Sequence, residues 1–193
     1  MGYVEIIAIL DRSGSMQSMQ NEAIGGFNNF LKSQKEVEGE AKITTVLFDD
    51  QYELLYNGIN LKEAPELDLF TYVPRGMTAL WDAIGKTINT VSDRIDKMNK
   101  EDRPSKVIVA ILTDGFENAS QEFKGEDIKK LISFFSNGDW EFIYLAANQD
   151  AIQTGTQIGI DSSGCYNFAA TADGTTWAYE SMGNTVKKLR SQR

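Results

Sequence analysis

The chain has 193 residues, of which 41% are hydrophobic and 24% charged, and its formal net charge is −9. This composition is typical of a soluble globular protein, and the acidic balance argues against nucleic acid or an anionic membrane as a partner. The sequence contains no histidine, which excludes the commonest general base and the imidazole ligands of a catalytic zinc site.

The length and the cysteine content set the expected organisation and compartment. We expect one domain over residues 1–193, with a core at about 3–170 and a C-terminal helix at about 171–193. The only cysteine, Cys165, rules out an internal disulfide and is expected to be buried in a strand. No apolar run approaches the ~20 residues of a membrane span, and a strand pattern starts too early for a signal peptide. These features predict a cytoplasmic protein.

The first element is an apolar run at 4–10 that ends in a small, polar and acidic segment. A run without alternation is typical of a strand buried on both faces of a parallel sheet. The segment after it carries Asp11, Ser13 and Ser15 in an Asp-x-Ser-x-Ser pattern, and Gly14 permits a tight turn. One carboxylate and two hydroxyls offer only oxygen, which favours a hard divalent cation.

The rest of the chain alternates between strand and helix patterns. Further strands are predicted at 41–48, 51–56, 106–112, 140–146 and 166–168, and helices at 19–37, 79–98, 125–136, 148–158 and 171–193. Asp49 and Asp50 form a connection too short for a parallel crossover, so we expect a hairpin there; a turn explains the two aspartates more simply than a second metal site. The pattern predicts an α/β fold: a doubly wound, mostly parallel central sheet with one antiparallel strand and helices on both faces.

Two later segments carry further oxygen ligands. Thr78 lies in an Arg-Gly-Met-Thr segment at the start of the helix predicted at 79–98, where it can either cap the helix or bind a metal. Asp114 follows the strand predicted at 106–112 in a Thr-Asp-Gly turn. Ligands of open α/β sheets bind beyond the carboxyl ends of strands, and both Asp11 and Asp114 lie at such ends.

Taken together, the Asp-x-Ser-x-Ser loop, Thr78 and the Thr-Asp-Gly turn resemble the metal-ion-dependent adhesion site of von Willebrand factor A domains, a Rossmann-like fold shared with integrin inserted domains. The resemblance extends to about residue 147 and is nearest to compact, stand-alone bacterial and phage domains. It implies Mg²⁺, or Mn²⁺ or Ca²⁺, with the serines binding directly and one or both aspartates acting through water. The implied metal ligands are Asp11, Ser13, Ser15, Thr78 and Asp114.

The resemblance also implies a function and a class of partner. A carboxylate from an Asp or Glu of a partner protein would complete the metal shell, and an AAA-type ATPase is one implied partner. The prediction is therefore a metal-dependent protein-binding module and not an enzyme. One alternative is a Mg²⁺-dependent phosphohydrolase or phosphotransferase, although Ser13 stands where haloacid-dehalogenase phosphatases have a second aspartate and no Walker lysine motif occurs. The other is a metal-free structural interaction domain.

Three charged residues are predicted to form the partner-binding rim of this site: Arg12, Arg75 and Glu117. Arginine on the rim can orient an incoming carboxylate before it reaches the ion. For Arg12 an alternative remains open, in which the side chain folds back and pairs with a nearby acidic residue.

Overall fold

The computed structural model describes residues 2–192 and is built on a six-stranded sheet with the strand order β3-β2-β1-β4-β5-β6. The strands are β1 (Val4–Asp11), β2 (Ala41–Phe48), β3 (Tyr52–Asn60), β4 (Lys106–Thr113), β5 (Trp140–Ala146) and β6 (Cys165–Asn167). Only β2 and β3 pair antiparallel; the other neighbouring strands are parallel. The predicted mixed sheet with one antiparallel hairpin is confirmed.

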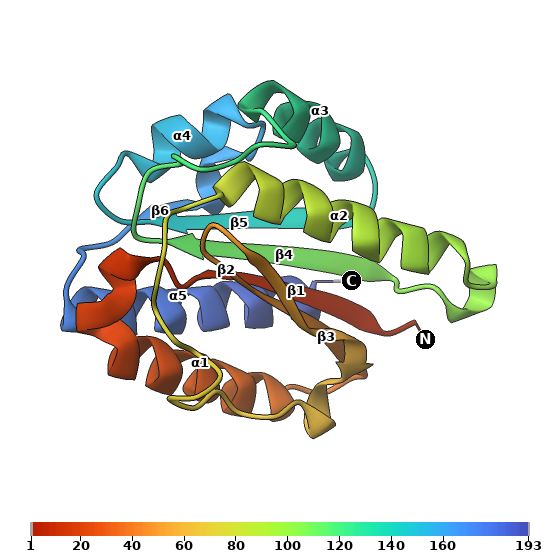
Figure 1. Cartoon of the computed structure of the whole chain (residues 1–193). Helices are drawn as coiled ribbons and strands as arrows, with labels where there is room; N and C mark the ends of the chain where they lie inside the picture. The colour runs from red at the N-terminus through yellow and green to blue at the C-terminus, as the bar shows by residue number, and fades with distance from the viewer. Residues whose placement is uncertain (1, 193) are drawn as a thin grey trace.

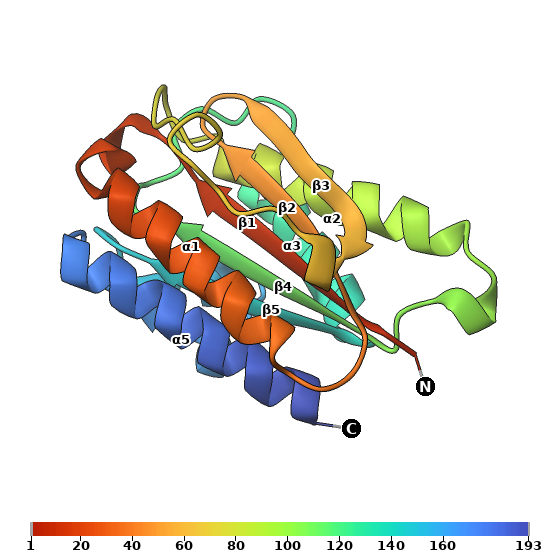
Figure 2. The ribbon, with the colours of Figure 1, turned by 90° about the horizontal axis from the view of Figure 1, so that it is seen from below.

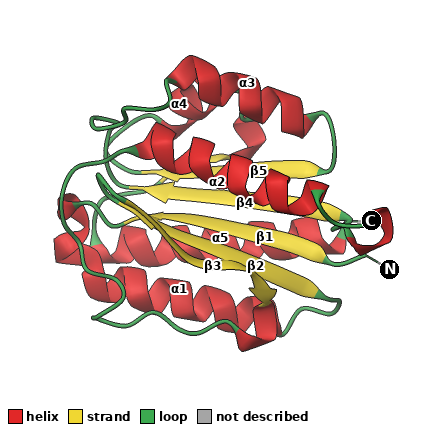
Figure 3. Ribbon diagram, turned by 45° about the vertical axis from the view of Figure 1, so that its right-hand side comes forward, coloured by secondary structure: helices red, strands yellow, loops and turns green. Residues whose placement is uncertain are grey.

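Helices cover both faces of this sheet (Figures 1 and 3). The helices are α1 (Gln20–Lys35), α2 (Leu80–Asp96), α3 (Gly125–Ser136), α4 (Ala151–Gln157) and α5 (Ala172–Ser191). Figure 1 shows α1 and α5 below the sheet and α2, α3 and α4 above it. None of the helices within 2–192 combines the length and the apolar character that a membrane span needs.

The central strands contribute to two cores because successive side chains of a strand point to opposite faces. Along β1, Ile6, Ala8 and Leu10 pack with α1 and α5, whereas Ile7 and Ile9 pack with α2, α3 and α4. All five side chains are fully buried. This two-sided burial explains why the sequence of β1 is a continuous apolar run, and it leaves polar side chains only where the strand ends.

Helices α1 and α5 lie side by side beneath the sheet (Figure 2). A Cβ atom at Gly26 of α1 would lie 2.5 Å from Cδ2 of Tyr179 in α5, so the glycine permits this close packing. From the sequence one would expect the Gly25–Gly26 pair to approach the sheet; the close approach is instead to α5, and Gly25 has open space around it. The C-terminal helix is thus part of the layer that covers one face of the sheet.

Several element boundaries differ from the predicted ones. β3 continues to Asn60, beyond the predicted end at residue 56, because Gly58 takes a left-handed conformation (φ +68°) at an irregular pairing with β2. The helix predicted at 19–37 is α1, and the loop before it forms a 3₁₀ segment, Gly14–Met19, that was not predicted. The predicted helix at 148–158 starts only at Ala151, because Asn148 has φ 57° and the Asp150 side chain caps the helix.

Candidate metal centre

The three predicted site segments meet at the carboxyl ends of β1 and β4, the left-hand end of the sheet in Figure 1. Asp11 is the last residue of β1, and its carboxylate accepts hydrogen bonds from the Ser13 backbone N–H (2.6 Å) and the Thr113 hydroxyl (2.6 Å). The Ser15 hydroxyl donates to Oδ1 of Asp114, 2.7 Å away and 99 positions later in the chain. The fold therefore brings the two aspartates and both serines into one cluster.

The spacing of these oxygens can be compared with that of a metal shell. Mg²⁺ binds six oxygens at ~2.0–2.1 Å in an octahedron, so neighbouring ligand oxygens lie about 3 Å apart. Ser13 Oγ lies 3.2 Å from Ser15 Oγ, and Ser15 Oγ lies 2.7 Å from Asp114 Oδ1. These two separations are close to the edges of such an octahedron, so the Ser13, Ser15 and Asp114 oxygens are spaced as neighbouring ligands of a small divalent ion would be.

Thr78 faces the same cluster from the opposite segment. A Cβ atom placed on Gly115 would lie 3.4 Å from Thr78 Oγ1 and 3.9 Å from Ser15 Oγ, so both hydroxyls lie around the open side of this glycine. The Thr78 segment is held there by backbone hydrogen bonds from Gly14 to Gly76 (3.2 Å) and from Arg75 to Arg12 (2.9 Å). Because residue 115 is a glycine, the space beside it is open to the oxygen ligands.

The hydroxyl of Thr78 is not used as a helix cap. The first N–H groups of α2 are satisfied by the loop after β4: Glu117 accepts from the Trp81 N–H (2.9 Å) and Ser120 from the Asp82 N–H (3.0 Å). Within the described chain the Thr78 hydroxyl makes no hydrogen bond, although the residue is only 4% exposed. The sequence left open whether Thr78 caps the helix or binds a metal, and in the structure it does not cap the helix.

The two carboxylates of the cluster are buried without a cationic side chain beside them. Asp11 and Asp114 are 0% and 1% exposed, and among residues 2–192 neither is part of an ion pair. Burial raises the pKa of Asp11 to about 6, although hydrogen bonds from Thr113 and Ser13 act to lower it. Burial also raises the pKa of Asp114. The cluster thus carries negative charge in a place where charge is costly.

This cost leads to a stability prediction for the metal-free protein. A carboxyl group whose pKa is higher folded than unfolded favours folding when protonated, so its contribution falls as the pH rises from about 4 through about 6. At pH 7 with a chelator, Asp11→Asn is expected to be as stable as the wild type or more stable, by up to about 2 kcal/mol. Urea unfolding at pH 4 and pH 7 measures this, and a clear loss of stability at pH 7 would contradict it.

Of the three predicted rim residues, Arg12 is 3% exposed, and its Nε donates to Asp49 Oδ2 (3.0 Å) while its guanidinium also pairs with Glu53. This is the folded-back arrangement. Arg75 is half exposed, but its Nε donates to the same Asp49 oxygen (2.9 Å). The Glu117 carboxylate is occupied by three N–H groups and one hydroxyl of the nearby chain. All three charges are therefore engaged within the protein.

Several residues that position the cluster were not singled out from the sequence. The Tyr72 hydroxyl donates to the Asp11 carbonyl, the Asn118 side chain accepts from the Thr78 N–H (2.9 Å), and the Asn148 side chain donates to the Asp114 carbonyl (2.7 Å). Asp49, expected only as a turn residue, makes an Asx turn with Gln51 and also binds both arginines. Apart from the Asx turn, each of these contacts joins segments that are distant in the chain; the local signal available in the sequence was the position of Asp49 directly after β2.

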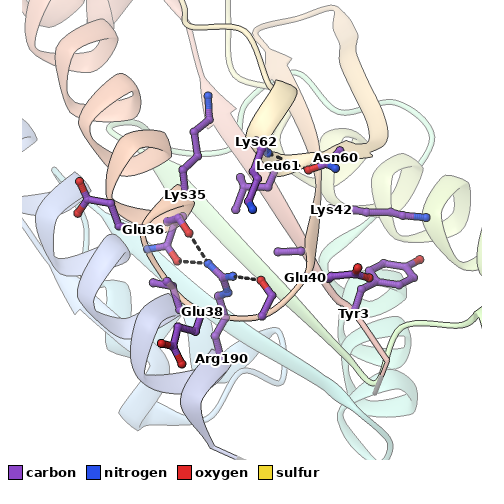
Figure 4. A pocket seen from close by; sticks show the side chains of 14 residues that line it. Tyr3, Lys35, Glu36, Glu38, Glu40, Lys42, Asn60, Leu61, Lys62 and Arg190 are labelled. Carbon is purple, nitrogen blue, oxygen red and sulfur yellow. Dashed lines mark hydrogen bonds between the residues drawn. The ribbon is translucent and has the colours of Figure 1, made fainter.

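A separate cavity of about 570 Å³ lies at the opposite end of the sheet, where β1 and β2 begin (Figure 4). Its wall includes Tyr3, Lys42 and Asn60, together with the acidic turn after α1. The Arg190 guanidinium of α5 closes one side by donating to the Gln34 and Gly39 carbonyls. Its side chains carry both charge signs, and it shares none of its lining residues with the oxygen cluster.

Comparison with known proteins gives a match in structure only. No family model matches the sequence, and no curated protein matches it either. Among solved structures, the von Willebrand factor domain of the type V pilus tip protein Mfa5 from Porphyromonas gingivalis is 11% identical with a TM-score of 0.71, covering 100% of this chain and 97% of that one. A von Willebrand factor type A protein from Catenulispora acidiphila is 15% identical with a TM-score of 0.66, covering 100% and 43%.

A third similar structure is that of proximal thread matrix protein 1 from the mussel byssus, described as having a zinc-occupied MIDAS motif, the metal-ion-dependent adhesion site. It is 14% identical with a TM-score of 0.64, covering 96% of this chain and 46% of that one. The chain spans less than half the length of this protein and of the Catenulispora protein. At these identities the similarity establishes the fold, a Rossmann-like α/β fold of the von Willebrand factor A type, and the likeness extends past residue 147.

Proposed function

We propose that this chain is a divalent-metal-dependent protein-binding module. In this proposal the metal, Mg²⁺ or another divalent ion, is held by the oxygen cluster, and a carboxylate of a partner protein completes its shell. The ligands are Asp11, Ser13, Ser15, Thr78 and Asp114. The partner is a protein that presents an Asp or Glu side chain; an AAA-type ATPase and a cytoplasmic location remain predictions from the sequence.

The observation that carries the proposal is the pair of buried carboxylates, Asp11 and Asp114, which form no ion pair with any residue from 2 to 192. Two negative charges from Asp11 and Asp114 balance one divalent ion, and the Ser13 and Ser15 hydroxyls add neutral oxygens at a spacing close to the edges of an octahedral shell. Arg12 is the nearest arginine in sequence, but it is bound to Asp49. A buried anionic pair that the protein does not neutralise itself is suited to bind a cation.

The surrounding residues hold the cluster in place. Thr113 and the Ser13 N–H orient both oxygens of Asp11, and the Asn118 side chain holds the Thr78 backbone. A bound divalent ion would supply an electrophilic position for a partner carboxylate, because the five protein ligands add no excess negative charge. The zinc-occupied MIDAS motif named for the mussel protein supports a metal in this fold.

Isothermal titration calorimetry with Mg²⁺ and Mn²⁺ tests the proposal. The wild type is expected to bind one ion, with modest affinity because hydroxyls and water form much of the shell, and Asp11→Ala is expected to abolish binding. Asp50→Ala, an exposed aspartate on the adjacent turn, serves as the matched control and is expected to bind as the wild type does. Equal binding by Asp11→Ala and the wild type, or no binding by the wild type, would contradict the assignment.

A further inference from the structure

Large apolar side chains are exposed next to the candidate ligands. Met77 directly precedes Thr78 and is 56% exposed, and Phe116 follows Asp114 by two positions and is 62% exposed. Soluble proteins seldom expose such side chains in groups unless the surface binds a partner. Thr78 and Asp114, which lie close to them in the sequence, are buried, so the exposure of Met77 and Phe116 is not a general property of these two loops.

Hydrogen bonds join the two segments that carry these residues. The Asn118 N–H donates to the Thr78 carbonyl (3.0 Å), and the Asn118 side chain accepts from the Thr78 N–H (2.9 Å). The segments that carry Met77 and Phe116 are therefore joined side by side. Gly115, which directly precedes Phe116, lies beside the Thr78 and Ser15 hydroxyls, since a Cβ atom there would be 3.4 Å and 3.9 Å from them.

Two further exposed apolar residues are tied to the same loops. Val73, 42% exposed, lies between Tyr72, whose hydroxyl binds the Asp11 carbonyl, and the segment that pairs with Arg12. Ile152, 46% exposed, is in the first turn of α4, after Gln149, whose side chain donates to the Gly115 carbonyl (2.8 Å). We call Val73, Met77, Phe116 and Ile152 the apolar rim.

The three charged residues predicted for the partner-binding rim are already engaged within the protein. Arg12 is buried against Asp49, Glu117 is occupied by the start of α2, and Arg75 shares the Asp49 carboxylate. The overall charge of −9 would repel a strongly acidic partner. Contact around the cluster must therefore come mainly from apolar burial, which contributes more binding energy than exposed charge pairs do.

From this arrangement we infer that the apolar rim is a docking surface for a protein segment in which a single Asp or Glu is flanked by large apolar side chains. The inference rests on the proposed function, since the carboxylate of that segment is the one that would reach the metal. Met77 and Phe116 contact the flanking side chains, and the oxygen cluster selects the carboxylate. A partner rich in acidic residues is disfavoured by the charge of the domain.

The test uses a displayed library of random 12-residue peptides, selected on the full chain with Mg²⁺ and eluted with a chelator. The enriched peptides are expected to carry one Asp or Glu next to Leu, Ile, Phe or Trp. Enrichment of peptides with several acidic residues and no apolar neighbours overturns the inference, and so does a selection in which nothing enriches. Calorimetry with Mg²⁺ alone, without peptide, shows separately whether the proposed metal function has failed.

The enriched peptides are then titrated against surface variants. Met77→Ser and Phe116→Ser are each expected to weaken binding by about tenfold or more, while the affinity for Mg²⁺ stays within about twofold of the wild type. Phe134→Ser is the matched control, because Phe134 is 73% exposed but lies near the C-terminal end of α3. Equal effects of Phe116→Ser and Phe134→Ser would overturn the inference.

A second copy of the chain is the other candidate occupant of the rim. Sedimentation of the wild type at increasing concentration distinguishes the two, and a monomer is expected. A dimer that Met77→Ser and Phe116→Ser abolish together would assign the rim to self-association and overturn the inference.

Discussion

Replacing Arg94 with methionine is expected to lower the free energy of unfolding by about 3–5 kcal/mol, because it leaves a buried carboxylate without its partner. Glu5 of β1 is 0% exposed, and its Oε1 accepts from Arg94 Nη2 (2.7 Å) and from the Thr44 hydroxyl (2.7 Å). Gly58 makes room for the arginine, since a Cβ atom there would lie 2.3 Å from Arg94 Nη1. Urea unfolding at pH 7 measures the loss.

Two controls separate this buried pair from an ordinary surface pair. Arg103→Met removes an arginine whose carboxylate partner, Asp96, is mostly exposed, and it is expected to cost less than about 1 kcal/mol. The double variant Glu5→Leu with Arg94→Met removes both charges and should recover most of the lost stability. If Arg94→Met cost no more than Arg103→Met, the pair would have no special role in stability.

Asp82→Ala is expected to destabilise the protein by about 2–4 kcal/mol and to weaken metal binding if the proposed site is correct. The Asp82 carboxylate of α2 accepts from three successive N–H groups, those of Gln121 (2.9 Å), Glu122 (2.9 Å) and Phe123 (2.8 Å). These bonds hold the loop that begins at Asp114. Without the carboxylate, three N–H groups lose their acceptor and the loop loses its connection to α2.

The pH dependence of this effect has a definite sign. Burial acts to raise the pKa of Asp82, but the backbone hydrogen bonds outweigh it, so the pKa is lower than that of a free aspartate. Its contribution to stability is therefore present above the unfolded pKa of about 4 and is lost as the pH falls through the folded value. Unfolding at pH 7 and at pH 3 should show a smaller gap between wild type and variant at the lower pH.

Asp93→Ala is the control for helix α2, because Asp93 is exposed on the same helix, and it should change stability by no more than about 0.5 kcal/mol. A loss of metal binding in Asp82→Ala with unchanged stability would point to a direct role of Asp82 in the site. A loss of stability with intact metal binding would show that the loop holds its shape without this contact.

Much of the fold could be predicted from local patterns in the sequence. The helix α3 and the strand β5 have the predicted bounds, because a regular apolar period has few other solutions. The hairpin of β2 and β3 followed from the length of its connection. The Asp-x-Ser-x-Ser loop and the Thr-Asp-Gly turn directly follow buried strands, so that their meeting at one edge of the sheet could be expected from the topology.

What only the tertiary structure decided was the partner of each polar side chain. The sequence allowed Arg12 to face a ligand or to fold back, and Asp49, the buried carboxylate that binds it, lies 37 positions away. It also allowed Thr78 to cap α2, but in the structure Glu117 and Ser120, which lie in another loop, accept hydrogen bonds from the first N–H groups of this helix. Which partner a polar side chain binds depends on groups that are distant in the chain. Leaving a buried polar group unpaired costs more free energy than local conformational preferences contribute, so those preferences do not determine the pairing. Periodicity and turn length act over a few residues, which is why they specify the elements but not these contacts.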